Sequence, residues 1–282
     1  MAVEIKDWYY WPCQSYSGAL NMALDDWASR HILKELDRPL LRFFTWTPEC
    51  ISLGYHQKES ELNLELCRND GVDVVRRPTG GRAILHAREL TYSVVYPFQS
   101  LNVETFYRDI HLPFVKALQQ MGVPAEFQAA QADFRKFYQT DRSAVCFATS
   151  AKYEVEIERK KLIGSAQRVY EKSILQHGSL LLGQRHRDLV NYLKLPENAR
   201  QRVLRHVDEH TAHVWQYNRE VDAVNLAERV KSAFEAEFGI RFTPIDEAPE
   251  LKAKMLAKAD RDAFRIQSAG KKFEEEGAPV SG

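Results

Sequence analysis

The stretch of residues 76–96 constrains the fold most, because it joins β-prone runs through a break built from glycine. It reads RRPTGGRAILHARELTYSVVY and directly follows the β-prone run of residues 72–75. Runs of this kind, separated by proline and glycine, are typical of strands that cross at a tight turn. Gly80 and Gly81 let a ligand approach the backbone, and successive N–H groups can bind a carboxylate, phosphate or carbonyl oxygen. The sequence therefore predicts strands with a candidate binding site at one turn.

Charged side chains are concentrated at this turn. Arg76, Arg77 and Arg82 would bring positive charge to it, and His86 follows within the same eleven residues. A Gly-Gly pair between strands is more often a plain hairpin turn, and single surface arginines are usually solvated. The close spacing of the cluster favours a binding site over that alternative.

Length and composition narrow the classes of protein. The 282 residues suffice for one large domain or two modest ones, and 39 Lys plus Arg balance 39 Asp plus Glu, which gives no support to nucleic-acid binding. We expect no secretion signal and no membrane span, because no apolar run approaches the roughly 20 residues that cross a bilayer. The cysteines lack CxxC spacing, so we expect free thiols, no metal site and a cytoplasmic location. They are Cys13, Cys50, Cys67 and Cys146.

Hydrophobic periodicity predicts an alternation of strands and helices. We expect helices at residues 17–36, 60–70, 103–121, 189–193, 198–207, 222–238 and 249–262. We expect strands at residues 8–16, 40–46, 50–55, 72–75, from 83, and at 90–96, 153–158, 161–163, 174–182 and 241–243. Residues 125–142 predict a long loop or a short irregular helix, and residues 267–282 a disordered tail. Asp25 and Asp26 are expected on the wetter side of the first helix, and a contiguous sheet over residues 72–182 is the simplest arrangement.

Two further segments carry candidate chemistry. A turn at Arg159-Lys160 should lead into a strand that begins with Lys161 and reaches a second turn of small residues, 164–167. Near that turn, the ammonium group of Lys161 could bind an acyl carbonyl or a phosphate. The strand of residues 174–182 is expected to break at His177-Gly178-Ser179. A lone lysine is usually a solvated charge, however, and a strand histidine is as often structural as chemical.

Cys146 is the candidate nucleophile. A cysteine in such a protein is usually a small buried hydrophobic residue. Cys146 lies where a polar segment meets a pair of strands, and basic residues downstream in the sequence would lower the pKa of its thiol if the fold brings them close. A thiolate attacks thioesters readily, which makes Cys146 a candidate carrier of an acyl group.

Several motifs in order resemble the biotin/lipoate protein ligase and lipoyl/octanoyl transferase superfamily. They are RRPTGGRAILH (76–86) with TYSVV (91–95), KLIGSAQ (161–167), QHGSLLL (176–182), NMALDD (21–26) and the segment from RFFTW to GYHQ (42–57). The resemblance implies an α+β fold, a mixed β-sheet flanked by helices, of the biotin/lipoate protein ligase type. It implies a catalytic domain over residues 1–245, a helical extension over 246–266 and the tail of 267–282.

Within the superfamily, the Ala-Val-Cys-Phe run and the Pro-Thr-Gly-Gly-Arg turn resemble octanoyltransferases of the LipM type. That resemblance implies that Cys146 takes an octanoyl group from octanoyl-acyl carrier protein as a thioester, without a cofactor. The group would pass to a lysine of a lipoyl domain, as in glycine-cleavage H protein or a 2-oxoacid dehydrogenase subunit. Lys161 would orient the acceptor and the carbonyl, with N–H groups near Gly164 stabilising the oxyanion. The substrate-binding residues implied are Arg76, Arg77, Thr79, Gly80, Gly81, His86, Gly164, Ser165, Ala166, Gln167, His177 and Gly178.

Three alternatives stay open. The first is an ATP- and Mg²⁺-dependent lipoate-protein ligase that forms a lipoyl-adenylate; against it, only some 40 residues follow Arg241, too few for the accessory domain of many such ligases. The second is octanoyl transfer between lipoyl domains, and the third a non-catalytic module that binds lipoyl domains. Because acyl carrier proteins are acidic, the basic groups at 185–187 and at Arg200, Arg202 and Arg205 are candidate docking surfaces.

Overall fold

Two β-sheets organise the protein in the computed structural model, which describes residues 2–98, 101–129 and 153–267. The larger sheet has the strand order β11-β1-β2-β6-β10-β9-β8-β7, and the smaller one the order β12-β4-β3-β5. The strands of the larger sheet are β1 (Asp7–Tyr16), β2 (Leu40–Trp46), β6 (Glu89–Pro97), β7 (Glu126–Ala129), β8 (Tyr153–Ile157), β9 (Lys160–Val169), β10 (Ser173–Leu181) and β11 (Arg241–Pro244). Those of the smaller sheet are β3 (Cys50–Leu53), β4 (Asp73–Arg76), β5 (Ile84–His86) and β12 (Arg265–Gln267). Both sheets mix parallel and antiparallel neighbours.

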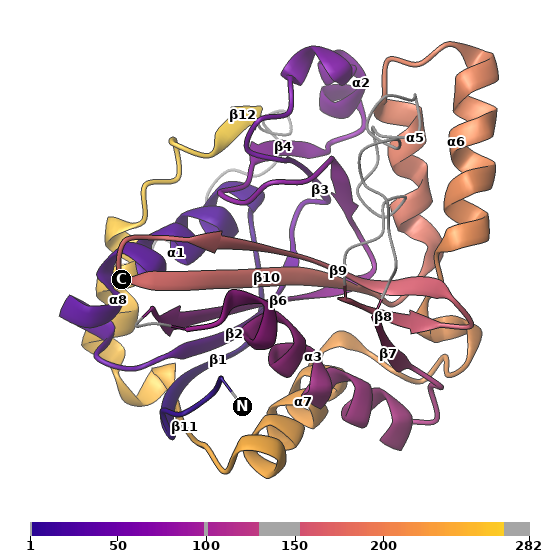
Figure 1. Ribbon diagram of the computed structural model, residues 1–282. Coiled ribbons are helices and arrows are strands. Elements are labelled where there is room, and N and C mark those ends of the chain that lie inside the picture. Colours follow the sequence, from indigo (N-terminus) through magenta and orange to yellow (C-terminus); the bar gives the residue numbers. More distant parts are fainter. Residues whose placement is uncertain (1, 99–100, 130–152, 268–282) are drawn as a thin grey trace, which may run out of the picture.

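Helices cover both faces of the larger sheet (Figure 1). The longer ones are α1 (Gly18–His31), α3 (Val103–Gln120), α6 (Glu197–His210), α7 (Ala223–Phe238) and α8 (Pro249–Lys258), and the shorter ones are α2 (Leu64–Asn69) and α5 (Leu189–Tyr192). One apolar core joins α3 and α7 to one face of the larger sheet, and another joins α1 and α8 to the opposite face. A third core packs α5 and α6 against the smaller sheet. The α+β class with a mixed sheet flanked by helices is therefore confirmed. The expectation of one contiguous sheet over residues 72–182 is wrong, because β4 and β5 belong to the smaller sheet and β6, β9 and β10 to the larger one.

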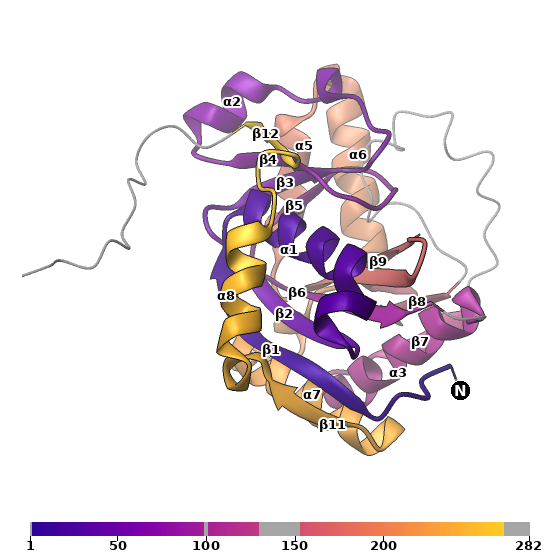
Figure 2. The ribbon, with the colours of Figure 1, turned by 90° about the vertical axis from the view of Figure 1, so that its left-hand side faces the viewer.

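Helix α1 begins at a side-chain cap and is buried along most of its length. Ser17 accepts a hydrogen bond from the Leu20 N–H at 3.4 Å, as a helix N-cap should. Asp25 is 1% exposed, which contradicts the expectation that it faces water. The helix lies between the larger sheet and α8 (Figure 2), so it has little wet surface at that position.

The smaller sheet carries the arginine-glycine turn between β4 and β5. Strand β3 pairs with both of them, parallel to β4 and antiparallel to β5. The far edge of β4 is paired with β12, and the Arg76 N–H donates to the carbonyl of Phe264 at 2.9 Å. Both ends of the turn are thus tied to strands, so its conformation is set by the sheet.

Two predicted breaks in the strands are wrong. Residues 164–167 lie inside the continuous strand β9, and 177–179 inside the continuous strand β10, where His177 pairs with Ala166. The small residues serve close packing instead: a Cβ on Gly178 would lie 2.3 Å from Ser165 Oγ and 2.8 Å from the Gly164 carbonyl oxygen. The turn before β9 is formed by Glu158 and Arg159, with φ of 50° and 64°, one residue earlier than expected.

Other segments differ in detail from the expectations. The helix expected over residues 17–36 is α-helical only to His31, and Ile32–Leu36 forms a π-helical turn. The predicted loop at 125–142 begins with β7, which pairs with β8, and its later part lies outside the described residues, as do 268–282 of the predicted tail. None of the helices in the described ranges combines the length and apolarity needed to cross a bilayer.

Candidate active site

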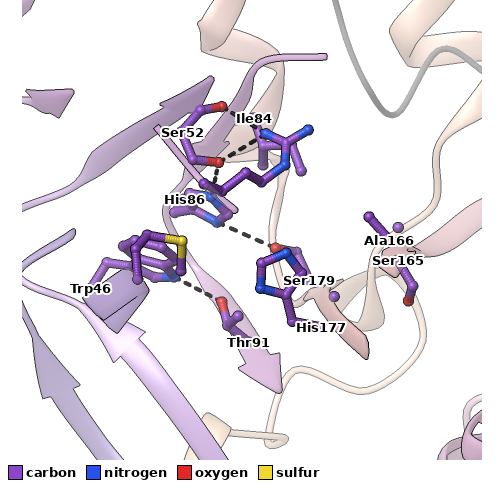
Figure 3. A pocket seen from close by; sticks show the side chains of 13 residues that line it. Trp46, Ser52, Ile84, His86, Thr91, Ser165, Ala166, His177 and Ser179 are labelled. Atoms are coloured by element: carbon purple, nitrogen blue, oxygen red, sulfur yellow. Dashed lines mark hydrogen bonds between the residues drawn. The ribbon is translucent and has the colours of Figure 1, made fainter. Parts of the chain in front are cut away.

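A pocket lies where the arginine-glycine turn, α1 and the paired strands β9 and β10 meet. It has a volume of about 370 Å³, counting the part that opens to solvent. In Figure 3, Trp46 lies on the opposite side of the pocket from Ala166, with His177 and Ser179 between them. The lining residues come from both sheets and α1: Met22, Trp46, Ser52, Arg77, Ile84, His86, Thr91, Gly164, Ser165, Ala166, His177, Gly178 and Ser179. Apolar walls with a few hydroxyl and imidazole groups suit a ligand with an apolar chain and one polar end.

Arg77 holds the turn together from inside. It is 4% exposed, and its guanidinium donates to the carbonyls of Ser52 at 2.9 Å, Gly80 at 2.8 Å and Arg82 at 2.7 Å. Because these acceptors belong largely to the turn itself, Arg77 fixes the path of the Pro-Thr-Gly-Gly backbone. The positive charge expected here is in large part directed inward.

Arg76 and Arg82 have carboxylate partners. Arg76 is 3.0 Å from Glu59 and donates to the carbonyls of residues 54, 55 and 57, whereas Arg82 lies 3.7 Å from Glu61. The prediction of a positively charged turn is therefore right about the location and overstates the free charge. These two side chains tie the turn to the loop after β3.

The glycines of this region have different tasks. A Cβ on Gly54 would lie 1.9 Å from the Gly81 carbonyl oxygen, so Gly54 lets the turn pack against β3. Gly81 has φ of 93°, a conformation that favours glycine, and a Cβ on Gly80 would meet nothing within 4 Å. Within the described residues, the N–H groups of Gly80 and Gly81 donate to no backbone carbonyl. The residues around Gly164, by contrast, belong to strand β9.

A buried polar cluster joins α1 to the turn through His177. Its Nδ1 lies 3.2 Å from Asp25 Oδ2, and its Nε2 2.6 Å from Thr79 Oγ1. Burial lowers the pKa of His177, which favours the neutral ring. Because a carboxylate only accepts, Nδ1 carries the proton and Nε2 accepts from the Thr79 hydroxyl. Asp25 also pairs with the buried Arg42 at 3.2 Å.

A second polar chain includes His86. Its Nε2 lies 2.7 Å from Ser52 Oγ and its Nδ1 2.7 Å from Glu89 Oε1. Glu89 also accepts from Thr91 and Ser179, and the His86 ring stacks on Trp46 with centroids 3.9 Å apart. These contacts fix the His86 ring against the pocket wall.

The Ser165 hydroxyl belongs to a cluster on the α3 side of the sheet. His111 Nδ1 lies 2.7 Å from the Tyr107 carbonyl, so this nitrogen is the donor, and Nε2 accepts from Ser165 Oγ at 2.8 Å. Tyr92 lies 2.8 Å from the same hydroxyl. Burial lowers the pKa of His111 to about 4, so its ring is neutral near pH 7.

Lys161 lies at the start of β9 and is not among the residues that line the pocket. Its Nζ is 2.6 Å from Glu154 Oε1, and both side chains are almost fully buried, at 8% and 2% exposed. Burial, and then the neighbouring Glu154, raise the pKa of Glu156 on the same strand. The ammonium group of Lys161 is therefore fixed by Glu154. Lys161 lies three residues before Gly164 on β9.

The structure brings together seven of the predicted binding residues in the pocket wall: Arg77, His86, Gly164, Ser165, Ala166, His177 and Gly178. Thr79 is hydrogen-bonded to His177, Arg76 is the last residue of β4, and Gly80 and Gly81 belong to the turn. The Gln167 side chain donates to Gln176, away from the pocket, and Cys146 lies outside the described residues. Sequence reasoning assigned no role to Met22, Asp25, Trp46, Ser52 or Glu89. Asp25 offered one signal, a charged residue beside the apolar stripe of α1.

Comparison with known proteins identifies the family. The family of the lipoyl protein ligase A/B catalytic domain matches residues 17–235. The chain belongs to this family. It is 37% identical to octanoyltransferase LipM of Kyrpidia tusciae over 86% of this chain and 93% of that protein. With octanoyltransferase LipM of Clostridioides difficile it shares 41% identity over 60% of this chain and 63% of that protein.

Solved structures of the family share the fold. The bi-partite lipoate protein ligase of Thermoplasma acidophilum, studied with its lipoyl domain, superposes with a TM-score of 0.70 over 93% of this chain and 99% of that chain, at 19% identity. In the part of the chain that the structure describes, no group of three or more His, Cys, Asp or Glu side chains is placed to hold a metal ion.

Proposed function

We propose that this protein is an octanoyltransferase, which moves an octanoyl group from octanoyl-acyl carrier protein to a lysine of a lipoyl domain. The observation that carries the proposal is the likeness to LipM octanoyltransferases over nearly their whole length. The pocket adds support, because its apolar walls suit a fatty chain. Burying an eight-carbon chain at about 0.8 kcal/mol per methylene contributes roughly 5 kcal/mol to binding.

The proposed reaction has two steps and consumes no cofactor. In the first, the Cys146 thiolate attacks the carrier thioester, a new carbon–sulfur bond forms, the carbon–sulfur bond to the carrier breaks, and the carrier sulfur leaves as a thiolate. In the second, the neutral amine of the acceptor lysine attacks the Cys146 thioester. An amide forms, the cysteine sulfur leaves, and one proton is lost from the amine.

The described residues supply binding and charge for these steps. We assign the octanoyl chain to the pocket between Trp46 and Ala166, and its carbonyl to the mouth beside Gly80 and Gly81, whose N–H groups would bind the oxyanion. We assign Lys161 the role of a fixed positive charge near the reacting carbonyl, held in place by Glu154. Arg77 and His177 would hold the turn in a fixed position relative to the pocket wall.

Intact-mass spectrometry tests the first step. After incubation with octanoyl-acyl carrier protein, the enzyme should gain one octanoyl group, and Cys146→Ala should gain none. Cys50→Ala is the control, because Cys50 is a buried thiol outside the pocket wall and should leave the adduct unchanged. Full transfer activity in Cys146→Ala would overturn the proposal.

The alternative is a lipoate-protein ligase, favoured by the likeness in fold to the Thermoplasma acidophilum ligase. In that case ATP and Mg²⁺ would be needed, and pyrophosphate would be released when lipoate is present. Transfer of octanoyl from the carrier with no ATP present would exclude it.

A further inference from the structure

Arg168 lies at the rim of the pocket on the same face of β9 as the pocket wall. Alternate residues of a strand share a face, and Ala166, two residues earlier, lines the pocket. The pairing of Ala166 with His177 and of Arg168 with Leu175 puts both on the face that α1 covers. At about 3.3 Å per residue, Arg168 stands roughly 7 Å beyond the wall.

The guanidinium of Arg168 is held in position without a carboxylate. Its Nη1 donates to the Pro78 carbonyl at 2.9 Å, and its carbon lies 5.0 Å from the centroid of the Tyr55 ring and 4.8 Å from that of Tyr170. Tyr55 itself is 46% exposed. Within the described part of the chain, Arg168 forms no ion pair, in contrast to Arg76 and Arg82 beside it. The guanidinium is half-buried and held in one orientation, and among the residues that the structure describes only one of its N–H donors has an acceptor. Such a group is suited to bind a carboxylate of another protein.

We propose that Arg168, flanked by Tyr55, binds a carboxylate on the acceptor protein next to the lysine that receives the acyl group. This inference rests on the octanoyltransferase function proposed above. The guanidinium is preorganised in the free protein, because one hydrogen bond and two aromatic rings hold it in place. Little side-chain entropy is then lost on docking.

The reach of the two substrates favours the acceptor over the donor. A lysine side chain spans about 6 Å from Cα to nitrogen, so the acceptor's surface must come that close to the reacting carbonyl. Arg168 stands at a similar distance from the pocket wall. The donor carries its acyl group on a prosthetic arm much longer than a lysine side chain, so the donor protein stays farther out.

The basic group at residues 185–187, which the sequence offered as a docking surface, is less suited to that role. Arg185 lies 3.0 Å from Glu49 and 2.5 Å from Asp188, and Arg187 lies 2.9 Å from Asp208. Their charges are thereby largely compensated on their own surface. Arg187 is therefore a fitting control, as an arginine that is paired and does not line the pocket.

Steady-state kinetics of Arg168→Gln with a lipoyl domain test the proposal. We expect KM for the lipoyl domain to rise about tenfold, as for loss of one hydrogen-bonded charge pair, with kcat changed less than about twofold. The rate of octanoyl loading from octanoyl-acyl carrier protein, and octanoyl transfer to hydroxylamine, should match wild type. Arg187→Gln should match wild type in every measurement.

A lipoyl domain whose carboxylates beside the target lysine are changed to amides completes the test. Wild type and Arg168→Gln should have the same KM for this domain. An unchanged KM for the unmodified lipoyl domain in Arg168→Gln would overturn the proposal. Slower loading from the carrier would assign Arg168 to the donor, and an equal loss with hydroxylamine would make its role structural; each of these also overturns the proposal. Failure of the octanoyltransferase function is distinct, because wild type would then transfer octanoyl to no acceptor.

Discussion

Asp25→Asn should destabilise the fold strongly, although the substitution removes only one charge. Asp25 and Arg42 are each 1% exposed and lie 3.2 Å apart, and Arg42 also stacks 4.0 Å from the Phe44 ring. Without the carboxylate, the guanidinium keeps its charge in the core with no counter-charge. Breaking one side of a buried ion pair costs about 3–5 kcal/mol.

The loss in Asp25→Asn should be visible in thermal and denaturant unfolding. For a protein of this size, about 3–5 kcal/mol corresponds to a fall in Tm of roughly 5–9 °C. Asp26→Asn is the matched control. Asp26 pairs with Arg30, whose side chain is 56% exposed, and such a pair contributes less than about 1 kcal/mol. Asp26 also accepts from the Tyr170 hydroxyl at 2.8 Å, and the amide oxygen of Asn can accept that hydrogen bond as well.

A double variant tests the cause. Arg42→Met removes the stranded charge, so Asp25→Asn should cost less in that background than in wild type. Equal shifts of Tm in Asp25→Asn and Asp26→Asn, or additive effects of Asp25→Asn and Arg42→Met, would show that the stranded charge is not the cause.

Further predictions follow from glycine packing and from the buried histidines. Gly178→Ala should lower the free energy of unfolding by about 1–3 kcal/mol, because the new Cβ would collide with Ser165 and Gly164. Gly80→Ala should leave the free energy of unfolding nearly unchanged, because a Cβ there would meet no atom within 4 Å. Urea titrations measure both values, and equal effects would contradict the explanation by packing. Burial lowers the pKa of both His111 and His186 to about 4, so the unfolded chain binds more protons than the folded protein between pH 6.5 and 4. Stability should therefore fall as pH falls through that window, by up to about 1.4 kcal/mol per pH unit for each histidine, and His111→Gln should flatten the slope measured by urea unfolding. An unchanged slope in that variant would show that His111 takes up its proton without unfolding.

Local sequence patterns were sufficient to predict the strands and helices with strong periodicity. The first helix and the strands around residues 72–96 and 153–182 lie close to where the sequence predicts them, because apolar periodicity follows directly from one-sided burial. The superfamily motifs also located the pocket wall, since Arg77, Ala166 and His177 do line it.

Other features depend on contacts between distant segments, which local patterns do not encode. Small residues at 164–167 and 177–179 read as turns, yet they let β9 and β10 pair closely beneath the pocket. Asp25 reads as a solvated charge, because the arginine that pairs with it lies seventeen positions away on β2. For the same reason, the sequence overstated the charge at the turn: Arg77 finds its acceptors in the turn's own carbonyls.

The most direct test of octanoyl transfer is a chase of the isolated acyl-enzyme. Enzyme loaded from octanoyl-acyl carrier protein and freed of the carrier is mixed with a lipoyl domain in the absence of ATP, and both masses are followed in time. The account predicts that the octanoyl group leaves Cys146 and appears on the lipoyl domain at least as fast as steady-state turnover. An acyl-enzyme that stays loaded, or that transfers only when ATP is added, would contradict it.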